Sequence, residues 1–206
     1  MYDRRLILKS ALFLPATSLA AKLAPTVPAT AGPFYPVSIP LDADADLTQV
    51  QGKEKAATGV VAHLTGALSD QNGCAIKNAK IEIWQCDAFG AYHHPRDRGN
   101  IAEPEFQGYG FTQTDLSGAY RFKTITPVSY PGRAPHIHVR VSQPGMESLT
   151  TQLYLQNERS NEQDFLFNRI PPELRGYHIA EFPQTDEESE LITPVFDIVV
   201  NKTLSC

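Results

Sequence analysis

Residues 130–141 have the sequence YPGRAPHIHVRV, in which a proline-rich loop passes into an alternating pattern. Pro131 and Pro135 fix φ and lack an amide donor, so we expect an ordered, non-helical loop before residue 136. The alternation from residue 136 onward predicts a strand, and side chains two positions apart share one face of a strand. His136 and His138 are therefore expected to point to one face, while Ile137 points to the other.

Two imidazoles side by side at the start of a strand make half of a metal site. The alternative is that one histidine is satisfied in the core and the other is exposed at a sheet edge. The His-x-His pattern alone does not separate these two interpretations.

The composition indicates one soluble globular domain. The chain has 206 residues, of which 16 are proline and 13 are glycine, and this favours many short elements joined by turns. The formal charge is −5 and there is no basic stripe, so nucleic acid is excluded as an expected partner. Cys74, Cys86 and Cys206 do not have metal-binding spacing. Either one pair of these cysteines forms a disulfide or all three are free thiols.

Residues 1–31 are predicted to be an export signal and its processing region. Residues 3–9, DRRLILK, contain a twin arginine, and a short apolar run follows over residues 10–21. That run is too short to be a stable membrane anchor. Small residues at 18–20 and 29–31 offer processing sites. We therefore expect an exported protein, periplasmic or extracellular, translocated by the twin-arginine route; the alternative is a frayed amphipathic N-terminus.

Residues 32–206 are predicted to form one all-β domain. The fold class is an antiparallel β-sandwich, immunoglobulin- or transthyretin-like, with long loops and little helix. A proline-rich segment, residues 24–40, should lie on it as an extended arm. Residues 115–118 should form a hairpin turn and residues 161–169 one short helix. The expected strands are residues 60–68, 80–86, 111–114, 119–123, 136–141, 149–155 and 194–200.

A site with two histidines needs further ligands, and two tyrosines near loops are the candidates; the alternative is that both are ordinary core residues. Tyr92 lies in the long polar loop of residues 89–110, and Tyr130 precedes the proline-rich loop. Tyrosine titrates near a pKa of ~10 and is a poor ligand for soft divalent ions at neutral pH. A trivalent ion such as Fe(III) stabilises the phenolate, and two phenolates with two imidazoles leave it one net positive charge.

Residues 83–92 (IWQCDAFGAY), residues 110–122, Tyr130 and residues 133–138 (RAPHIH) resemble the intradiol ring-cleavage dioxygenases. The resemblance runs from about residue 64 to residue 156, with residues 32–36 (GPFYP) as a weaker match. It implies an enzyme that holds one non-haem Fe(III) per chain and cleaves a catecholic ring with O2 to a muconate-type diacid.

The resemblance also implies residue roles. Tyr92, Tyr130, His136 and His138 match the metal ligands. Tyr130 is the ligand that substrate displaces, and it takes a proton from the substrate. Arg133 and Gln152 match catalytic residues that also bind substrate, and Trp84 matches a residue of the pocket wall. The alternatives are plain core packing for Trp84 and a sheet-edge amide for Gln152. His63 and His178 match no such role and are interpreted as structural or surface residues.

Two departures from the family pattern leave the ring substituents of the substrate and the oligomeric state open. The loop of residues 130–136 is short, so the ring substituents of the substrate cannot be inferred. We find no helical N-terminal dimerisation domain, so the oligomeric state, including a homo-oligomer, stays open.

Two other functions compete with the dioxygenase. The first is a non-catalytic β-sandwich binding module that retains the fold, with or without the metal. The second is a divalent-metal hydrolase or cupin-type enzyme built on His-x-His. Arg140 stands where a His-x-His-x-Asp site needs its carboxylate, and residues 141–143 supply no glutamate for a cupin.

Overall fold

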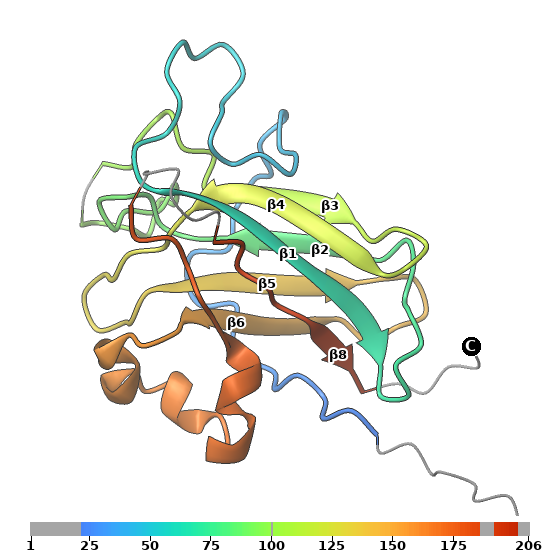
Figure 1. The fold of residues 1–206 in the computed structure, drawn as a ribbon. Coiled ribbons are helices and arrows are strands. Elements are labelled where there is room, and N and C mark those ends of the chain that lie inside the picture. Colours follow the sequence, from blue (N-terminus) through green and yellow to red (C-terminus); the bar gives the residue numbers. More distant parts are fainter. Residues whose placement is uncertain (1–21, 100, 186–191, 202–206) are drawn as a thin grey trace, which may run out of the picture.

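The computed structural model describes residues 22–99, 101–185 and 192–201, and within these ranges the strands form two facing sheets (Figure 1). One sheet has the order β4-β1-β8 and the other has the order β3-β2-β5-β6-β7. The strands are β1 (Val61–Asp70), β2 (Lys80–Trp84), β3 (Tyr109–Gln113), β4 (Ala119–Ile125), β5 (His136–Ser142), β6 (Leu149–Leu155), β7 (Ile179–Ala180) and β8 (Ile198–Val200).

The predicted all-β sandwich is confirmed, with mostly antiparallel pairing. Short parallel pairs occur only at the sheet edges among the described strands, between β1 and β8 and between β6 and β7. Helical structure in the described ranges is limited to the 3₁₀ segments η1 (Arg159–Gln163), η2 (Phe167–Arg169) and η3 (Pro172–His178).

The alternation of β5 decides which side chains enter the core. Ile137, Val139 and Val141 are fully buried in the apolar cluster between the sheets. His136 and His138 lie on the opposite face, which carries the site described below. A slip of one residue in register would exchange the two faces and place both histidines in the apolar core, so burial specifies this register strongly.

The predicted hairpin at residues 115–118 is wrong. β3 pairs with β2, and β4 pairs with β1, so the turn crosses from one sheet to the other. The turn itself forms as expected, because the Asp115 carboxylate accepts hydrogen bonds from the amides of Ser117 and Ala119. Those local bonds are the same whether the two strands pair with each other or with separate partners.

The single short helix predicted for residues 161–169 is also wrong. The segment holds the end of η1 and all of η2, which are separated by residues 164–166, and the backbone of Asp164 is extended. The Asp164 carboxylate accepts hydrogen bonds from the amides of Leu166 and Phe167, and these compete with helical bonding.

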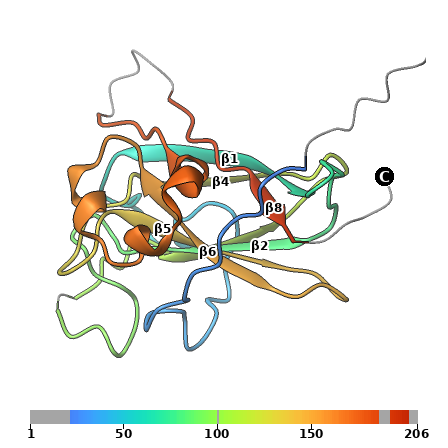
Figure 2. The ribbon, with the colours of Figure 1, turned by 90° about the horizontal axis from the view of Figure 1, so that it is seen from below.

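The N-terminal arm, defined here as residues 22–40, lies on the sandwich as expected. Figure 2 shows its first part passing beneath β8 and β6. The amide of Thr26 donates to the carbonyl of Val199, and the amide of Ala29 donates to the carbonyl of Thr150. The arm thereby satisfies part of the exposed edge of β6, which would otherwise carry unpaired backbone groups.

Two further findings bear on the sequence expectations. Cys74 is disulfide-bonded, and Cys86 is a free, buried thiol. Within the described ranges, no helix has the length and apolar character needed to cross a membrane. The twin arginine and the apolar run after it lie outside the described residues.

Candidate metal centre

The two histidines stand on β5 with partners from β6 directly opposite. His136 pairs with Tyr154 and His138 with Gln152, and all four side chains point to the face away from the core. Both histidines are 1% exposed, so neither is the solvent-facing residue of a sheet edge. The strand period that predicted a shared face is confirmed.

The imidazole nitrogens converge on one point. Nδ1 of His136 lies 2.6 Å from the carbonyl oxygen of Ala134 and donates to it, so Nε2 carries the lone pair. That Nε2 lies 3.2 Å from Nε2 of His138. Burial, with the Arg133 guanidinium nearby, lowers the pKa of His136 to about 4, and burial lowers the pKa of His138 as well. Both rings are therefore neutral at physiological pH, which is the state that binds a metal.

A tight turn positions Tyr92 beside these nitrogens. The Asp87 carboxylate accepts hydrogen bonds from the amides of Phe89 and Ala91, and Gly90 adopts a φ of +80° that favours glycine. The Tyr92 ring stacks on Phe34 of the arm at 4.7 Å between centroids. Its hydroxyl is buried beside the phenol of Tyr130, but no described residue lies at the distance and angle of a hydrogen bond to it.

Tyr130 completes the group from the other side. Residues 130–133 form a turn in which Gly132 has a φ of +84° and the amide of Arg133 donates to the carbonyl of Tyr130. The Tyr130 hydroxyl lies 3.5 Å from Nε2 of His136, and its ring is perpendicular to that of Tyr92 at 5.5 Å. The structure therefore brings together Tyr92, Tyr130, His136 and His138 from three separate segments.

This donor set fits a hard, highly charged cation. Burial raises the pKa of both tyrosines, so the phenols stay protonated unless a strongly polarising ion replaces the proton. The described residues contain no group of three or more His, Cys, Asp or Glu side chains suited to a metal, so any ion here would need the phenolic oxygens. An unpartnered buried hydroxyl such as that of Tyr92 costs about 1–3 kcal/mol, and coordination would offset this cost.

Arg133 connects the centre to β6 and to the 3₁₀ segments. Its Nη1 lies 3.3 Å from Nε2 of His136, and its Nη2 donates to Oε1 of Gln152 at 2.6 Å and to the Tyr154 hydroxyl at 3.2 Å. Its Nε donates to Asp164 at 2.8 Å. Although burial opposes the charge, the bond to Asp164 raises the pKa of Arg133, so the guanidinium is a permanent cation beside the centre.

Asp164 and Tyr154 are site residues that the sequence analysis missed. The side chain of Asp164 is 0% exposed and that of Arg133 is 9% exposed, so this ion pair is a buried one. Asp164 also accepts from the amide of Ala134 and so anchors the loop that carries Arg133. Tyr154 could have been identified, because it lies two positions after Gln152 on the same strand face, whereas no local signal marked Asp164.

Trp84 packs directly on a proposed ligand. Its indole stacks on the His138 ring with 4.8 Å between centroids and 4° between planes. Trp84 is 1% exposed, and its Nε1 has no hydrogen-bond partner among the described residues. The observed contact is with the histidine, so Trp84 orients the ring of His138.

The lowered histidine pKa values predict how the metal-free protein responds to acid. In the unfolded chain a histidine takes up its proton near pH 6.5, whereas His136 in the fold does so only near 4. Between these values the unfolded state binds more protons, so stability falls as pH falls. Each such histidine contributes up to about 1.4 kcal/mol per pH unit.

Urea unfolding of chelator-treated protein at several values between about pH 7 and about pH 4.5 tests this. The unfolding midpoint should drop across this window, and the variant with both His136→Asn and His138→Asn should show a flatter profile. An equal slope in the variant and the wild type would contradict this assignment of the acid sensitivity.

Comparisons with known proteins place the chain among ring-cleaving dioxygenases. A dioxygenase family model matches residues 30–201. The protocatechuate 3,4-dioxygenase beta chain of Burkholderia cepacia is 34% identical over 171 residues, which are 78% of this chain and 72% of that one. The hydroxyquinol 1,2-dioxygenase of Corynebacterium glutamicum is 31% identical over 146 residues, which are 62% of this chain and 45% of that one.

Solved structures agree with this placement. The dioxygenase domain of a dioxygenase–carbohydrate-binding fusion from Streptomyces sp. SirexAA-E superposes with a TM-score of 0.67 at 27% identity, over 87% of this chain and all of that chain. An intradiol ring-cleavage dioxygenase from Tetranychus urticae has a TM-score of 0.69 at 22% identity, over 87% of this chain and 95% of that chain, and shows the same fold.

Proposed function

We propose that this chain, which belongs to the intradiol ring-cleavage dioxygenase family of enzymes, holds one non-haem Fe(III) ion and uses O2 to open a catecholic ring between its two hydroxylated carbons. The observation that carries the proposal is the convergence of two neutral imidazoles and two tyrosines, one with a buried, unpartnered hydroxyl. Tyr92, Tyr130, His136 and His138 would hold the ion. Bound iron would supply Lewis-acid and redox chemistry to a chelated catechol.

The surrounding residues have separate tasks in this proposal. Both tyrosines border cavities of similar size, about 340 Å³ at Tyr92 and about 310 Å³ at Tyr130, and the second also touches Arg133. Tyr92 is 5% exposed and Tyr130 is only partly buried, so we assign Tyr130 as the tyrosine that substrate reaches. With the ion bound, Tyr130 would be a phenolate, and because burial raises its pKa it would be a base able to take a proton from a catechol hydroxyl. Arg133 stabilises negative charge that develops on the ring, and Gln152 is held against Arg133 near the reacting atoms.

Isotope incorporation tests the reaction type. The iron-loaded protein is incubated under ¹⁸O₂ with catechol, protocatechuate or hydroxyquinol, each in a separate reaction. The product is analysed by mass spectrometry. We expect a muconate-type diacid that contains both ¹⁸O atoms, and no product from chelator-treated protein. A semialdehyde product, or incorporation of one atom only, would overturn the intradiol assignment. The comparisons do not favour the non-catalytic module.

We further propose that the protein is exported by the twin-arginine route. The disulfide at Cys74 supports this, because disulfides persist mainly in oxidising compartments. Of the two processing sites we favour residues 18–20, because Thr26 and Ala29 are bonded to the sheets and Thr30 contacts Gln152. N-terminal sequencing of exported protein should begin near residue 21; a start at Gly32 would contradict this choice.

A further inference from the structure

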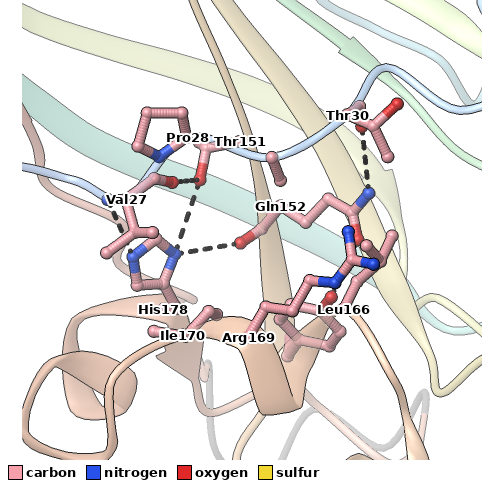
Figure 3. A pocket seen from close by; sticks show the side chains of 11 residues that line it. Val27, Pro28, Thr30, Thr151, Gln152, Leu166, Arg169, Ile170 and His178 are labelled. Carbon is pink, nitrogen blue, oxygen red and sulfur yellow. Dashed lines mark hydrogen bonds between the residues drawn. The ribbon is translucent and has the colours of Figure 1, made fainter.

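One segment of the arm, Val27 to Thr30, runs along β6 and covers a small cavity (Figure 3). The cavity has a volume of about 200 Å³ and is lined by the arm, by β6 and by the 3₁₀ segments. Gln152 and His178 lie on its wall, so a proposed catalytic residue and a buried histidine with no assigned role share one environment.

His178 joins the arm to β6. It is 1% exposed, at the end of η3. The amide of Val27 donates to its Nε2 at 3.2 Å, so this nitrogen carries the lone pair and Nδ1 carries the proton. Nδ1 lies 3.3 Å from the carbonyl oxygen of Gln152 and donates to it. Figure 3 shows the imidazole between these two backbone groups.

Neighbouring contacts strengthen the same junction. The Thr151 hydroxyl donates to the carbonyl of Val27 at 2.9 Å, and the amide of Ala29 donates to the carbonyl of Thr150 at 2.7 Å. Three successive residues of β6 therefore hold the arm in a single register. In that register the carbonyl of Thr30 lies 3.2 Å from Nε2 of Gln152 and accepts a hydrogen bond from it.

The carbonyl of Thr30 matters because it orients the Gln152 amide. Oε1 of Gln152 accepts from Arg133 at 2.6 Å and from the Tyr154 hydroxyl at 2.8 Å. A half-turn of the amide would place its NH₂ group against these donors and its oxygen against the Thr30 carbonyl. The arm and Arg133 therefore select the same orientation from opposite ends of the amide. In this orientation Nε2 of Gln152 also lies 3.3 Å from Nδ1 of His138, on the side of that ring away from the other proposed ligands.

We propose that His178 is a positioning residue for the dioxygenase reaction: it holds the arm so that the Thr30 carbonyl orients Gln152, and through Gln152 the Arg133 guanidinium. This rests on the proposed function. His178 makes its hydrogen bonds to the arm and β6, rather than to Tyr92, Tyr130, His136 or His138. Its loss should therefore spare iron binding and slow turnover.

The test uses iron-loaded full-length protein and two substitutions at one position. His178→Phe keeps an aromatic ring beside Phe196 and removes both hydrogen bonds. His178→Gln retains a donor and an acceptor. We expect kcat of His178→Phe to fall roughly 10- to 100-fold, as small misplacements of catalytic groups do, with KM and the visible spectrum of the anaerobic catechol complex unchanged. His178→Gln should recover most of kcat.

The control is Thr114→Val, which removes a buried hydroxyl that donates to the carbonyl of Ile76 at 2.7 Å. Thr114 follows β3 at the end opposite the residue that pairs with Trp84, away from the arm and the proposed ligands. It should lower the melting temperature and leave kcat unchanged. If His178→Phe does not fold, Thr151→Val serves instead, because it removes the hydroxyl bond to the arm at nearly constant volume.

The outcomes separate the two proposals. Wild-type protein that binds iron but opens no catechol defeats the proposed function. An active wild type, together with a His178→Phe variant whose kcat is unchanged, defeats the positioning role alone. A His178→Phe variant that loses iron or its charge-transfer band would also overturn it, because the residue would then support the metal rather than Gln152.

Discussion

Tyr92→Phe is expected to lose most of its bound iron and the colour that the iron gives. Activity should fall by more than about 100-fold, since removal of a residue that only supports a metal ligand already costs roughly 10- to 100-fold. The hydroxyl that the substitution removes is buried and lacks a hydrogen-bond partner among the described residues. The Phe34 ring stacked on Tyr92 makes the same contact with phenylalanine. One potential ligand is therefore removed and the packing is kept.

The same feature predicts the stability of the metal-free variant. Because the wild-type hydroxyl is buried without a partner, its removal should leave the unfolding free energy unchanged or raise it by about 1 kcal/mol. Tyr109→Phe provides the opposite pattern as a control. The Tyr109 hydroxyl donates to Glu82 at 2.6 Å, so its loss should lower stability by about 1–3 kcal/mol and leave iron in place.

Iron content by elemental analysis and urea unfolding of chelator-treated protein measure both halves of this prediction. Full iron content and activity in Tyr92→Phe would mean that another oxygen is the ligand. A large loss of stability without metal would mean that the hydroxyl has a structural partner, and the interpretation of its burial would be wrong.

Arg133→Lys is expected to keep iron and bind catechol but to lower kcat by roughly 100- to 1000-fold, the range for loss of a preorganised charge-stabilising donor. Lysine retains the positive charge, so this substitution tests the geometry of the guanidinium separately from its charge. One ammonium cannot reach Asp164, Gln152 and Tyr154 as the planar guanidinium does. Arg133→Ala is less informative, because the Asp164 carboxylate would be left buried without its cation, at a cost of about 3–5 kcal/mol.

Steady-state oxygen uptake, together with the anaerobic catechol spectrum, measures this effect. Arg175→Lys is the matched control, because Arg175 lies over the Phe167 ring as Arg133 lies over the Phe165 ring. Within the described ranges, the Arg175 guanidinium donates only to backbone carbonyls of the 3₁₀ region. It should retain wild-type kcat. Turnover by Arg133→Lys within a factor of two of the wild type would remove the role proposed for the guanidinium geometry.

The periodicity of β5 was the part of the site that the local sequence pattern could predict, whereas only the family resemblance assigned roles there to Tyr92, Tyr130, Arg133 and Gln152. Alternation placed His136 and His138 on one face because a buried register admits only one choice of faces. The same period applied to β6 would have identified Tyr154 as a site residue, because it lies two positions after Gln152 on the same face. The failed hairpin at residues 115–118 shows the limit of such local signals, since turn chemistry does not say whether the flanking strands pair with each other.

Long-range contacts account for the rest of what was missed. Asp164 follows Arg133 by 31 positions and is joined to it only by the fold. The Thr30 carbonyl contacts Gln152 across 122 positions, and a backbone group carries no residue-type signal at all. His178 was interpreted as structural or surface, and its burial between the arm and β6 could be seen only in the structure.

The visible spectrum of purified protein reconstituted with Fe(III) tests the central claim most directly, with Tyr92→Phe recorded in parallel. The account predicts a broad tyrosinate-to-iron charge-transfer band in the blue-green that shifts to longer wavelength when catechol is added without oxygen, and that is lost in the variant. A wild-type protein that stays colourless after reconstitution would contradict coordination of Fe(III) by Tyr92 and Tyr130.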